Sequence, residues 1–372
     1  MAGIYVHIPF CASRCNYCAF YSNANMSHDT QKAYADSVIE ELTARRNEIY
    51  DTVSTIYFGG GTPSQLTAEL LGKLLDTITH NYNIAPEPEI TIECNPEDLS
   101  GQYLAALHSI GFNRLSMGVQ TFDNSLLTLL HRRHDSLRAQ QAVHDAQHAG
   151  FNNITIDLMY GLPEQTEELL RKDINTAISL PIKHLSAYCL TYEPYTALDT
   201  LRRQGSVIET DDDTLNNYYD ILVDTLAKAG FEQYETSNFA IHGYHSRHNS
   251  AYWTGGQYLG VGAAAHSYDG QRTRRWNISD IKRYIQRDRW YDGEVLTDNE
   301  LYDEMVMLSL RQICGINLKQ MSERFGTHMT QQCLTKAQQY ISAGKLLHEA
   351  ECLRVSHEGM KILDMITATL MA

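Results

Sequence analysis

The chain has little proline, no stretch of strongly biased composition and no excess of positive charge. Its 372 residues include 8 prolines and 43% apolar residues, which excludes a disordered or fibrous protein. The 45 acidic and 30 basic side chains leave a formal net charge of −15, and this charge opposes general binding to nucleic acid. The length suits two to three domains, or one α/β barrel with an appendage.

Segments that direct a protein to a membrane are also missing. Residues 1–8 contain no basic segment ahead of an apolar run and no cleavage site of small residues, so we expect no signal peptide and a cytoplasmic location. The longest stretch without formal charge, residues 248–268, could span a bilayer by length alone. Its glycines and hydrogen-bonding side chains indicate a loop-rich site instead. In a chain that is not secreted, the 8 cysteines are not expected to form a disulfide framework.

Short β-rich runs alternate with helical patterns up to about residue 190, which is typical of βαβ units on a parallel sheet. Strands are predicted at residues 5–8, 55–58, 89–94, 114–117, 153–158 and 184–190, and helices at 30–50, 67–82, 137–149 and 167–180. Ligands of such sheets bind at the C-terminal ends of the strands. The residues that follow each strand are therefore the candidates for a site.

The pattern changes in the second half of the chain. A helix is predicted at 214–229 and a strand near 232–236. In the last part, helical periodicity is interrupted by two short strands, at 346–348 and 352–355, which is typical of a winged-helix-like unit. The acidic chain favours a packing or partner-binding role over DNA binding for this unit. We expect domains at 1–210, 211–298 and 299–372.

Three cysteines, Cys11, Cys15 and Cys18, follow the first predicted strand. Three thiolates can hold a [4Fe–4S] cluster and leave one iron free for a small molecule. A structural zinc site would need a fourth ligand, and no second cysteine pair follows at a suitable spacing. A redox Cys-x-x-Cys motif would leave the third cysteine unexplained. The other cysteines are expected to pack in the core: they are Cys94, Cys189, Cys314, Cys333 and Cys352.

The cysteine loop and its flanks, YVHIPFC at 5–11 and CNYCAF at 15–20, resemble the radical S-adenosylmethionine (SAM) superfamily. The resemblance is to the branch that contains the HemN-type coproporphyrinogen III dehydrogenases and the HemW-type heme chaperones. It implies a [4Fe–4S] cluster on Cys11, Cys15 and Cys18, with SAM on the open iron. It also implies an α/β fold: a partial (β/α)6 barrel, an adjoining α/β segment and a C-terminal winged-helix-like domain.

The same resemblance implies a SAM site at the ends of the predicted strands. Glycines let the backbone approach a ligand closely, a carboxylate accepts hydrogen bonds from an ammonium group or ribose hydroxyls, and an arginine pairs with a carboxylate. Arg133 stands beside Arg132, so the sequence leaves open which of the two arginines faces the ligand. The residues assigned to SAM are Tyr5, Tyr17, Gly60, Gly61, Thr62, Glu93, Gln120, Arg132, Asp157, Thr191 and Ala264.

A second motif, His-Asn-x-x-Tyr-Trp at 248–253, resembles one that is characteristic of HemW proteins and connected there with heme. Imidazole is a common axial ligand of heme iron, and aromatic rings offer flat apolar surface. From the residues alone, His248 would be interpreted as a histidine satisfied within an aromatic loop. The resemblance instead implies heme contacts from His248, Tyr252 and Trp253. His242 and His245 could extend a metal site if the segment were helical, but Gly243 argues against that.

Two functions follow from the resemblance. One is a heme chaperone, which is not an enzyme; the other is an oxygen-independent coproporphyrinogen III dehydrogenase. The dehydrogenase pattern continues CxxxCxxC-x-C, whereas position 20 is Phe20. The first predicted strand also begins close to residue 1, so we expect no N-terminal extension of the dehydrogenase kind. Both features favour the chaperone. Its expected partners are heme and an apo-hemoprotein recipient. The identity of the recipient, peripheral contact with membrane proteins and a homodimeric state stay open.

Overall fold

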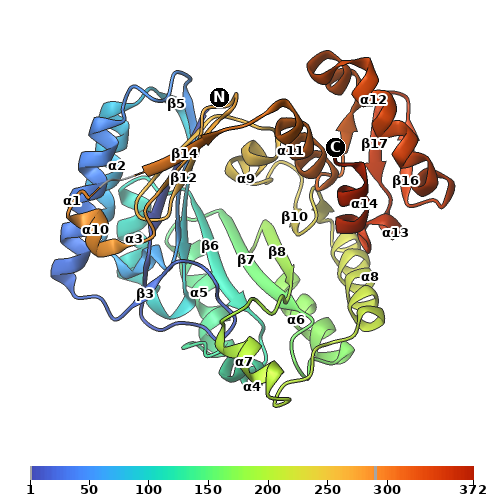
Figure 1. Cartoon of the computed structure of the whole chain (residues 1–372). Coiled ribbons are helices and arrows are strands. Elements are labelled where there is room, and N and C mark those ends of the chain that lie inside the picture. The colour runs from blue at the N-terminus through green and yellow to red at the C-terminus, as the bar shows by residue number, and fades with distance from the viewer. Residues whose placement is uncertain (1, 289–290) are drawn as a thin grey trace.

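A twelve-stranded mixed sheet organises the computed structural model, which describes residues 2–288 and 291–372 (Figure 1). The strands lie in the order β14-β13-β12-β11-β1-β4-β5-β6-β7-β8-β10-β9. Seven neighbouring strands, from β11 to β8 in this order, run parallel. The parallel strands are β1 (Ala2–Ile8), β4 (Val53–Gly60), β5 (Ile84–Cys94), β6 (Arg114–Gln120), β7 (Asn153–Tyr160), β8 (His184–Cys189) and β11 (Tyr258–Val261). All six strands predicted up to residue 190 are confirmed.

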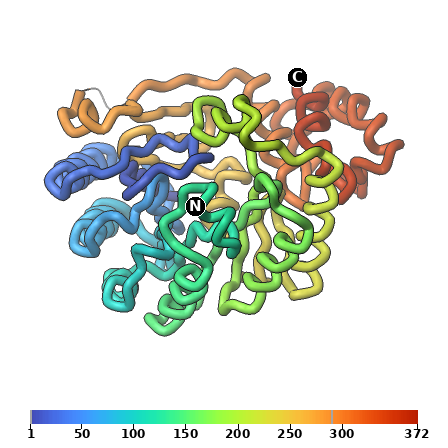
Figure 2. The backbone as a smooth tube through the Cα atoms, turned by 90° about the horizontal axis from the view of Figure 1, so that it is seen from below, coloured from blue at the N-terminus to red at the C-terminus, as the bar shows by residue number. Residues whose placement is uncertain are grey.

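Helices follow the parallel strands and cover the outer side of the curved sheet (Figures 1 and 2). They are α1 (His28–Ala44), α2 (Ala68–Asn81), α3 (Gly101–Ser109), α4 (Asn124–Leu129), α5 (Ser136–His148), α6 (Glu167–Ser179), α7 (Ala197–Arg203) and α8 (Asp212–Lys228). In α2, Thr67 caps the first turn and one stripe of leucine and isoleucine side chains is buried, as expected of an amphipathic helix. The sequence did not predict α3, which is short and buries only Leu104 and Leu107.

Residues 211–298 do not form a layer beside the barrel, because their strands extend both edges of the same sheet. On one edge β10 (Asn238–Ala240) and β9 (Glu232–Gln233) lie next to β8. On the other edge β11 lies next to β1 and is followed by β12 (His266–Tyr268), β13 (Thr273–Asn277) and β14 (Tyr291–Val295). The expected adjoining α/β segment is present, and its strands continue the large sheet. Positions 289–290 of that predicted domain, like Met1, lie outside the described residues.

The prediction of a loop-rich site at 248–268 is wrong in large part. The segment contains most of helix α9 (Arg247–Trp253) and the strands β11 and β12. Its glycines accommodate close packing of the backbone. A Cβ atom on Gly260 would lie 2.0 Å from the carbonyl oxygen of His266 in the neighbouring strand. Glycine here permits the β11–β12 hairpin rather than marking a loop.

The C-terminal part has its own small sheet and hydrophobic core, and it lies to one side of the large sheet (Figures 1 and 2). The sheet has the order β15-β17-β16, with β15 (Ile316–Asn317), β16 (Leu346–Glu349) and β17 (Cys352–Val355). The predicted strands at 346–348 and 352–355 are confirmed. The helices are α11 (Asp298–Leu310), α12 (Leu318–Ser342), α13 (His357–Met360) and α14 (Leu363–Leu370). The domain boundaries themselves stay predictions.

Ion pairs connect this part to the large sheet's helices. Asp220 of α8 accepts from Nε2 of His357 at 2.7 Å and from Nζ of Lys361 at 2.8 Å. Across residues 2–288 and 291–372, no helix combines the length and apolar character that crossing a membrane requires.

Candidate functional site

A cavity of about 350 Å³ lies where the cysteine loop meets the C-terminal ends of β4, β5, β6 and β7. The loop's place is set by β2 (Phe10–Cys11), which pairs with β3 (Asn23–Ala24), and by Asn16, whose Nδ2 donates to the carbonyl of Leu129 at 2.7 Å. The cavity is lined by all three cysteines of the loop and by eight of the residues assigned to SAM: Tyr17, Gly60, Gly61, Thr62, Glu93, Gln120, Arg132 and Asp157.

The sulfur atoms of the loop have hydrogen-bond donors nearby. The Thr62 hydroxyl donates to Sγ of Cys11 at 3.5 Å, and Nη1 of Arg132 donates to Sγ of Cys15 at 3.4 Å. All three cysteines are half-buried, and burial raises the pKa of Cys18. The three thiols lie on one wall of the cavity, and two of them face a hydrogen-bond donor. This arrangement suits a cluster bound by thiolates, because hydrogen-bond donors stabilise sulfur that carries negative charge.

The glycines at the end of β4 permit close approach to β1 and to the start of the cysteine loop. Gly60 has a φ of 114°, and a Cβ atom there would lie 2.4 Å from the ring of His7 in β1. A Cβ atom on Gly61 would lie 2.9 Å from the carbonyl oxygen of Phe10. A side chain at Gly60 would collide with His7, and one at Gly61 would push the end of β4 away from the cysteine loop. The glycine run is thus explained by the contact that forms the cavity.

Two buried carboxyl groups face the cavity. Glu93 accepts from the hydroxyl of Tyr57 at 2.7 Å and from the amide of Gly60 at 3.0 Å. Burial raises the pKa of Glu93 to about 7 and that of Asp157 to about 6. A buried carboxylate is stabilised by a cation or by hydroxyl donors. This side of the cavity therefore suits a ligand with an ammonium group and hydroxyls.

Arg132 lines the cavity, as Arg14 does, whereas Arg133 does not. Nη2 of Arg132 donates to Oδ1 of Asn95 at 2.7 Å and to the carbonyl of Gly118 at 2.5 Å. Its Nε is buried with no hydrogen-bond partner among the described residues. Arg133 instead lies 3.8 Å from Glu97 and 3.7 Å from Asp98. A buried guanidinium with a free donor suits a ligand carboxylate.

Gln120 reaches the cavity through an uncommon backbone conformation. Its φ is 73°, in the left-handed region, and the pairing of β6 with β7 shifts register between Gly118 and Gln120. Strain of this kind persists only where the surrounding structure holds it. It places the end of β6 against the cavity.

Three residues assigned to SAM do not line this cavity. Tyr5 lies within β1, where its hydroxyl and Nδ1 of His7 are 3.0 Å apart. Thr191 follows β8 and Ala264 follows β11. Their contact with SAM stays a prediction. The sequence reasoning in turn missed several residues that do line the cavity, although most of them stand within a few positions of an assigned residue: Arg14, Asn95, Ser116, Gly118, Met159 and Tyr188.

The second motif lies elsewhere, on α9, and His248 is buried beneath that helix with an exposed fraction of 2%. Its Nδ1 is 2.8 Å from the hydroxyl oxygen of Thr55, and its Nε2 is 3.0 Å from that of Tyr252. The ring stacks on Tyr57 with centroids 5.0 Å apart. Burial lowers the pKa of His248 to about 3. Both ring nitrogens therefore lie within hydrogen-bond distance of a hydroxyl group, and heme contact through His248 stays a prediction.

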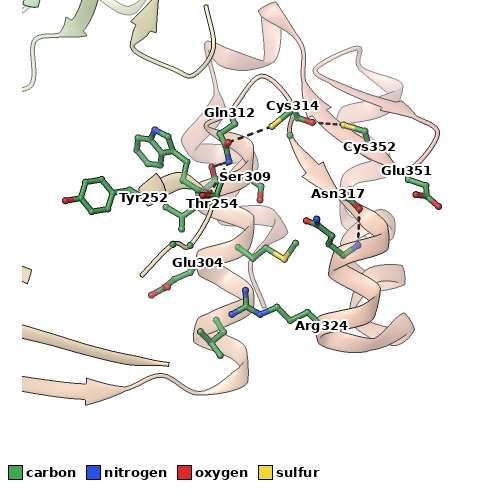
Figure 3. Close-up of a pocket in the computed structure, with 18 of the residues that line it drawn as sticks. Tyr252, Thr254, Glu304, Ser309, Gln312, Cys314, Asn317, Arg324, Glu351 and Cys352 are labelled. Carbon is green, nitrogen blue, oxygen red and sulfur yellow. Dashed lines mark hydrogen bonds between the residues drawn. The ribbon is translucent and has the colours of Figure 1, made fainter. Parts of the chain in front are cut away.

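Tyr252 and Trp253 differ from His248, because they line a larger cleft of about 930 Å³ between α9 and the C-terminal part (Figure 3). His242 and His245 do not reach it. His245 stacks on Tyr234, and His242 lies 3.6 Å from the carboxylate of Glu232.

The expectation that the remaining cysteines pack in the core holds for two of them. Cys94 and Cys333 are buried, whereas Cys189 and Cys314 are exposed and Cys352 is half-buried. Cys314 and Cys352 line the large cleft. Cys352 pairs with Asn317 in the β15–β17 ladder, and its thiol donates to the carbonyl of Cys314 at 2.7 Å.

The chain matches two family models, several curated proteins and a solved structure. The family model of the radical SAM superfamily matches residues 5–177, and that of the HemN C-terminal domain matches residues 296–362. A protein of Bacillus subtilis named heme chaperone HemW is 35% identical over 96% of this chain and 96% of its own length. The protein of that name from Lactococcus lactis is 33% identical, over 96% and 94%. The structure of coproporphyrinogen III oxidase (HemN) from Escherichia coli superposes with a TM-score of 0.85 at 24% identity, over 100% of this chain and 90% of that one.

Proposed function

This chain belongs to the radical SAM superfamily and, within it, to the family of the HemW heme chaperones, and we propose that it binds heme and delivers it to apo-hemoproteins. The relatives named heme chaperone HemW match it over nearly their whole length. The likeness to HemN concerns the fold. Phe20, in the place of the dehydrogenase's further cysteine, lines the cysteine cavity and is 70% exposed. Position 20 thus supplies no thiol, and the fourth cysteine on the cavity wall is the buried Cys94.

Membership of the superfamily implies a [4Fe–4S] cluster and SAM, and we propose that the cavity at the cysteine loop holds both. Cys11, Cys15 and Cys18 would bind the cluster, which supplies an open iron for the amino-acid part of SAM. Arg132 would bind the carboxylate of SAM, and Glu93 and Asp157 would accept hydrogen bonds from its ammonium group and its ribose.

SAM binding is expected to depend on pH through Glu93. The folded protein without ligand holds this carboxyl at a pKa of about 7, raised from 4.5 by burial. Below that pH the group is protonated and cannot pair with an ammonium ion, so SAM affinity should fall as pH drops from about 8 to about 6, by up to about tenfold per pH unit. Isothermal titration of the cluster-loaded protein at several pH values measures this. A Glu93→Gln variant should bind SAM weakly and with a much shallower profile, in which the remaining change near pH 6 comes from Asp157, whose pKa is about 6. An equally steep profile in that variant would assign the dependence to another group.

The observation that carries the chaperone proposal is the position of the His-Asn-x-x-Tyr-Trp motif. Tyr252 and Trp253 stand on the wall of a second cleft, outside the cavity of the cysteine loop. A porphyrin bound there would meet aromatic surface without occupying the predicted place of SAM. A dehydrogenase must instead bring its porphyrin substrate to SAM. A tetrapyrrole site that is separate from the SAM site therefore favours a protein that binds and transfers the tetrapyrrole over an enzyme that modifies it.

The proposal is tested by heme transfer. Anaerobically reconstituted protein should bind hemin with a stable absorbance band and pass it to apomyoglobin, which then shows its own heme spectrum. Under reducing conditions with SAM and coproporphyrinogen III, it should form no protoporphyrinogen IX over many turnovers. Sustained formation of protoporphyrinogen IX, together with no stable heme binding, would overturn the chaperone proposal in favour of the dehydrogenase.

A further inference from the structure

The cleft beside α9 lies between segments of the chain that hydrogen bonds connect to one another. Its walls come from α9, from the β11–β12 edge of the large sheet, from α11 and from the turns before β15 and between β16 and β17. Nε2 of Gln312 donates to the carbonyl of Trp253 at 3.1 Å and so ties α9 to the C-terminal part. At the other end of α9, Glu89 accepts from the amides of Arg247 and His248 at 3.1 and 3.0 Å. The volume of the cleft, about 930 Å³, lies within the usual range for sites of small molecules and cofactors.

The lining of the cleft suits a flat molecule that is apolar in the middle and acidic at one edge. Tyr252 and Trp253 supply aromatic surface, and Nε1 of Trp253 is buried without a hydrogen-bond partner among the described residues. In Figure 3, Cys314 and Gln312 lie at one end of the cleft, and Glu304 and Arg324 lie at the other. An aromatic wall with a cation at its far edge is the pattern expected for a macrocycle that carries carboxylates.

Charged side chains at the edge of the cleft set the orientation of a macrocycle that carries carboxylates. Arg324 and Arg274 stand on one side, where Nη2 of Arg274 lies 2.5 Å from Oε1 of Glu304. Glu349 and Glu351 stand on the side of the β16–β17 turn and would repel a carboxylate. The propionates of heme would therefore point toward the arginines.

Cys314 offers a sulfur to this cleft. Its side chain is exposed, and its Sγ has one weak contact, 3.8 Å from Oε1 of Gln312. Cys352 is different, because its thiol donates to the carbonyl of Cys314 at 2.7 Å and burial raises its pKa. Cysteine thiolate is an established ligand of heme iron. Of the two thiols, Cys314 is the one available to a metal.

We propose that this cleft is the heme site and that Sγ of Cys314 is the protein ligand to the iron, an inference that rests on the proposed function. On binding, the Cys314 thiol loses its proton to solvent and its sulfur donates an electron pair to ferric iron in exchange for a water or chloride ligand. No electron is transferred. The Cys314 thiolate lies at the accessible edge of the cleft, whereas the imidazole of His248 lies in the protein interior. A recipient protein can therefore replace Cys314 as the iron ligand without unfolding this chain.

The experiment compares hemin binding by four cluster-loaded proteins: wild type, Cys314→Ala, Cys352→Ala and His248→Ala. Cluster loading occupies the thiols of the cysteine loop, and a phosphine reductant keeps Cys314 and Cys352 free of disulfide without adding thiols. We expect a thiolate-type spectrum in wild type and in Cys352→Ala. We expect Cys314→Ala to lose that spectrum and to bind hemin about tenfold more weakly or worse. His248→Ala should keep the thiolate spectrum.

A metal-free probe separates the cleft from the ligand. Protoporphyrin IX has no iron, so Cys314→Ala should bind it like wild type. Ser309→Trp, which fills the cleft from α11, and Arg324→Gln should weaken its binding. Circular dichroism and the iron content of the cluster check that each variant is folded.

The outcomes distinguish this inference from the proposed function. If wild type binds and transfers heme but Cys314→Ala keeps the wild-type spectrum, the ligand assignment is overturned and the chaperone stands. Unchanged protoporphyrin binding in both Ser309→Trp and Arg324→Gln would overturn the assignment of this cleft as the heme site. If wild type binds no heme at all, the proposed function itself fails.

Discussion

Replacing Cys15 with alanine should leave a folded protein that retains little iron and sulfide after anaerobic reconstitution. Cys11, Cys15 and Cys18 line one cavity, and removing one of three protein ligands leaves a second iron of the cluster without one. Cys15 is the most informative choice because its sulfur accepts from Nη1 of Arg132. Iron and sulfide per chain and the charge-transfer absorbance of the cluster measure the loss, which we expect to exceed about tenfold.

Cys189→Ala is the matched control for this experiment. Cys189 is also an accessible thiol, at the end of β8, but it does not line the cavity. This variant should reconstitute like wild type. Undiminished iron and sulfide in a Cys11, Cys15 and Cys18 triple alanine variant would show that the cluster lies elsewhere.

Replacing Asp157 with asparagine should weaken SAM binding by about 10-fold to 100-fold and spare the cluster. The carboxyl lies within β7 and lines the cavity beside the cysteines, where desolvation raises its pKa. A hydrogen bond to a charged group contributes about 1.5–3 kcal/mol, which corresponds to this range of affinity. Equilibrium binding of SAM to the reconstituted variant gives the answer, and its iron content shows whether the cluster is intact.

Asp173→Asn provides a comparison with another buried carboxyl group. Asp173 accepts from the hydroxyl of Thr121 and the amide of Phe122, both at 2.7 Å, and it does not line the cavity. This variant should lower the melting temperature and leave SAM affinity near that of wild type. If Asp157→Asn binds SAM as wild type does, Asp157 is not part of the SAM site.

The parallel strands and the cysteine cavity were largely predictable from the sequence. Strands buried on both faces carry short apolar runs, which stand out between helical patterns. The cysteine loop and the Gly59–Pro63 segment each follow such a strand, and parallel strands end at one edge of the sheet. Eight of the eleven residues assigned to SAM therefore meet in one cavity. Tyr5, Thr191 and Ala264 do not, because alignment to a strand end does not state where a side chain points.

The heme motif shows the limit of such reasoning. His-Asn-x-x-Tyr-Trp reads as one motif, and its members lie at different depths. His248 and Tyr252 are four residues apart on one face of α9, where Nε2 of His248 lies 3.0 Å from the hydroxyl of Tyr252. His248 is buried against Thr55 and Tyr57, whereas Tyr252 and Trp253 also line the cleft. The sequence motif contains no information on the opposing wall, which comes from residues some sixty positions later.

Local spacing and apolar patterning specified the strands of the barrel, the three clustered thiols and the glycines that let β4 approach them, because each of these features depends on neighbouring residues. Only the tertiary structure decided that Arg132 rather than Arg133 faces the cavity, that residues 211–298 extend the large sheet, and that Cys314 shares a cleft with Trp253. The reason is physical. Those outcomes depend on packing between segments that are far apart in the chain, and such packing is set by the shapes and buried polar groups of both partners together.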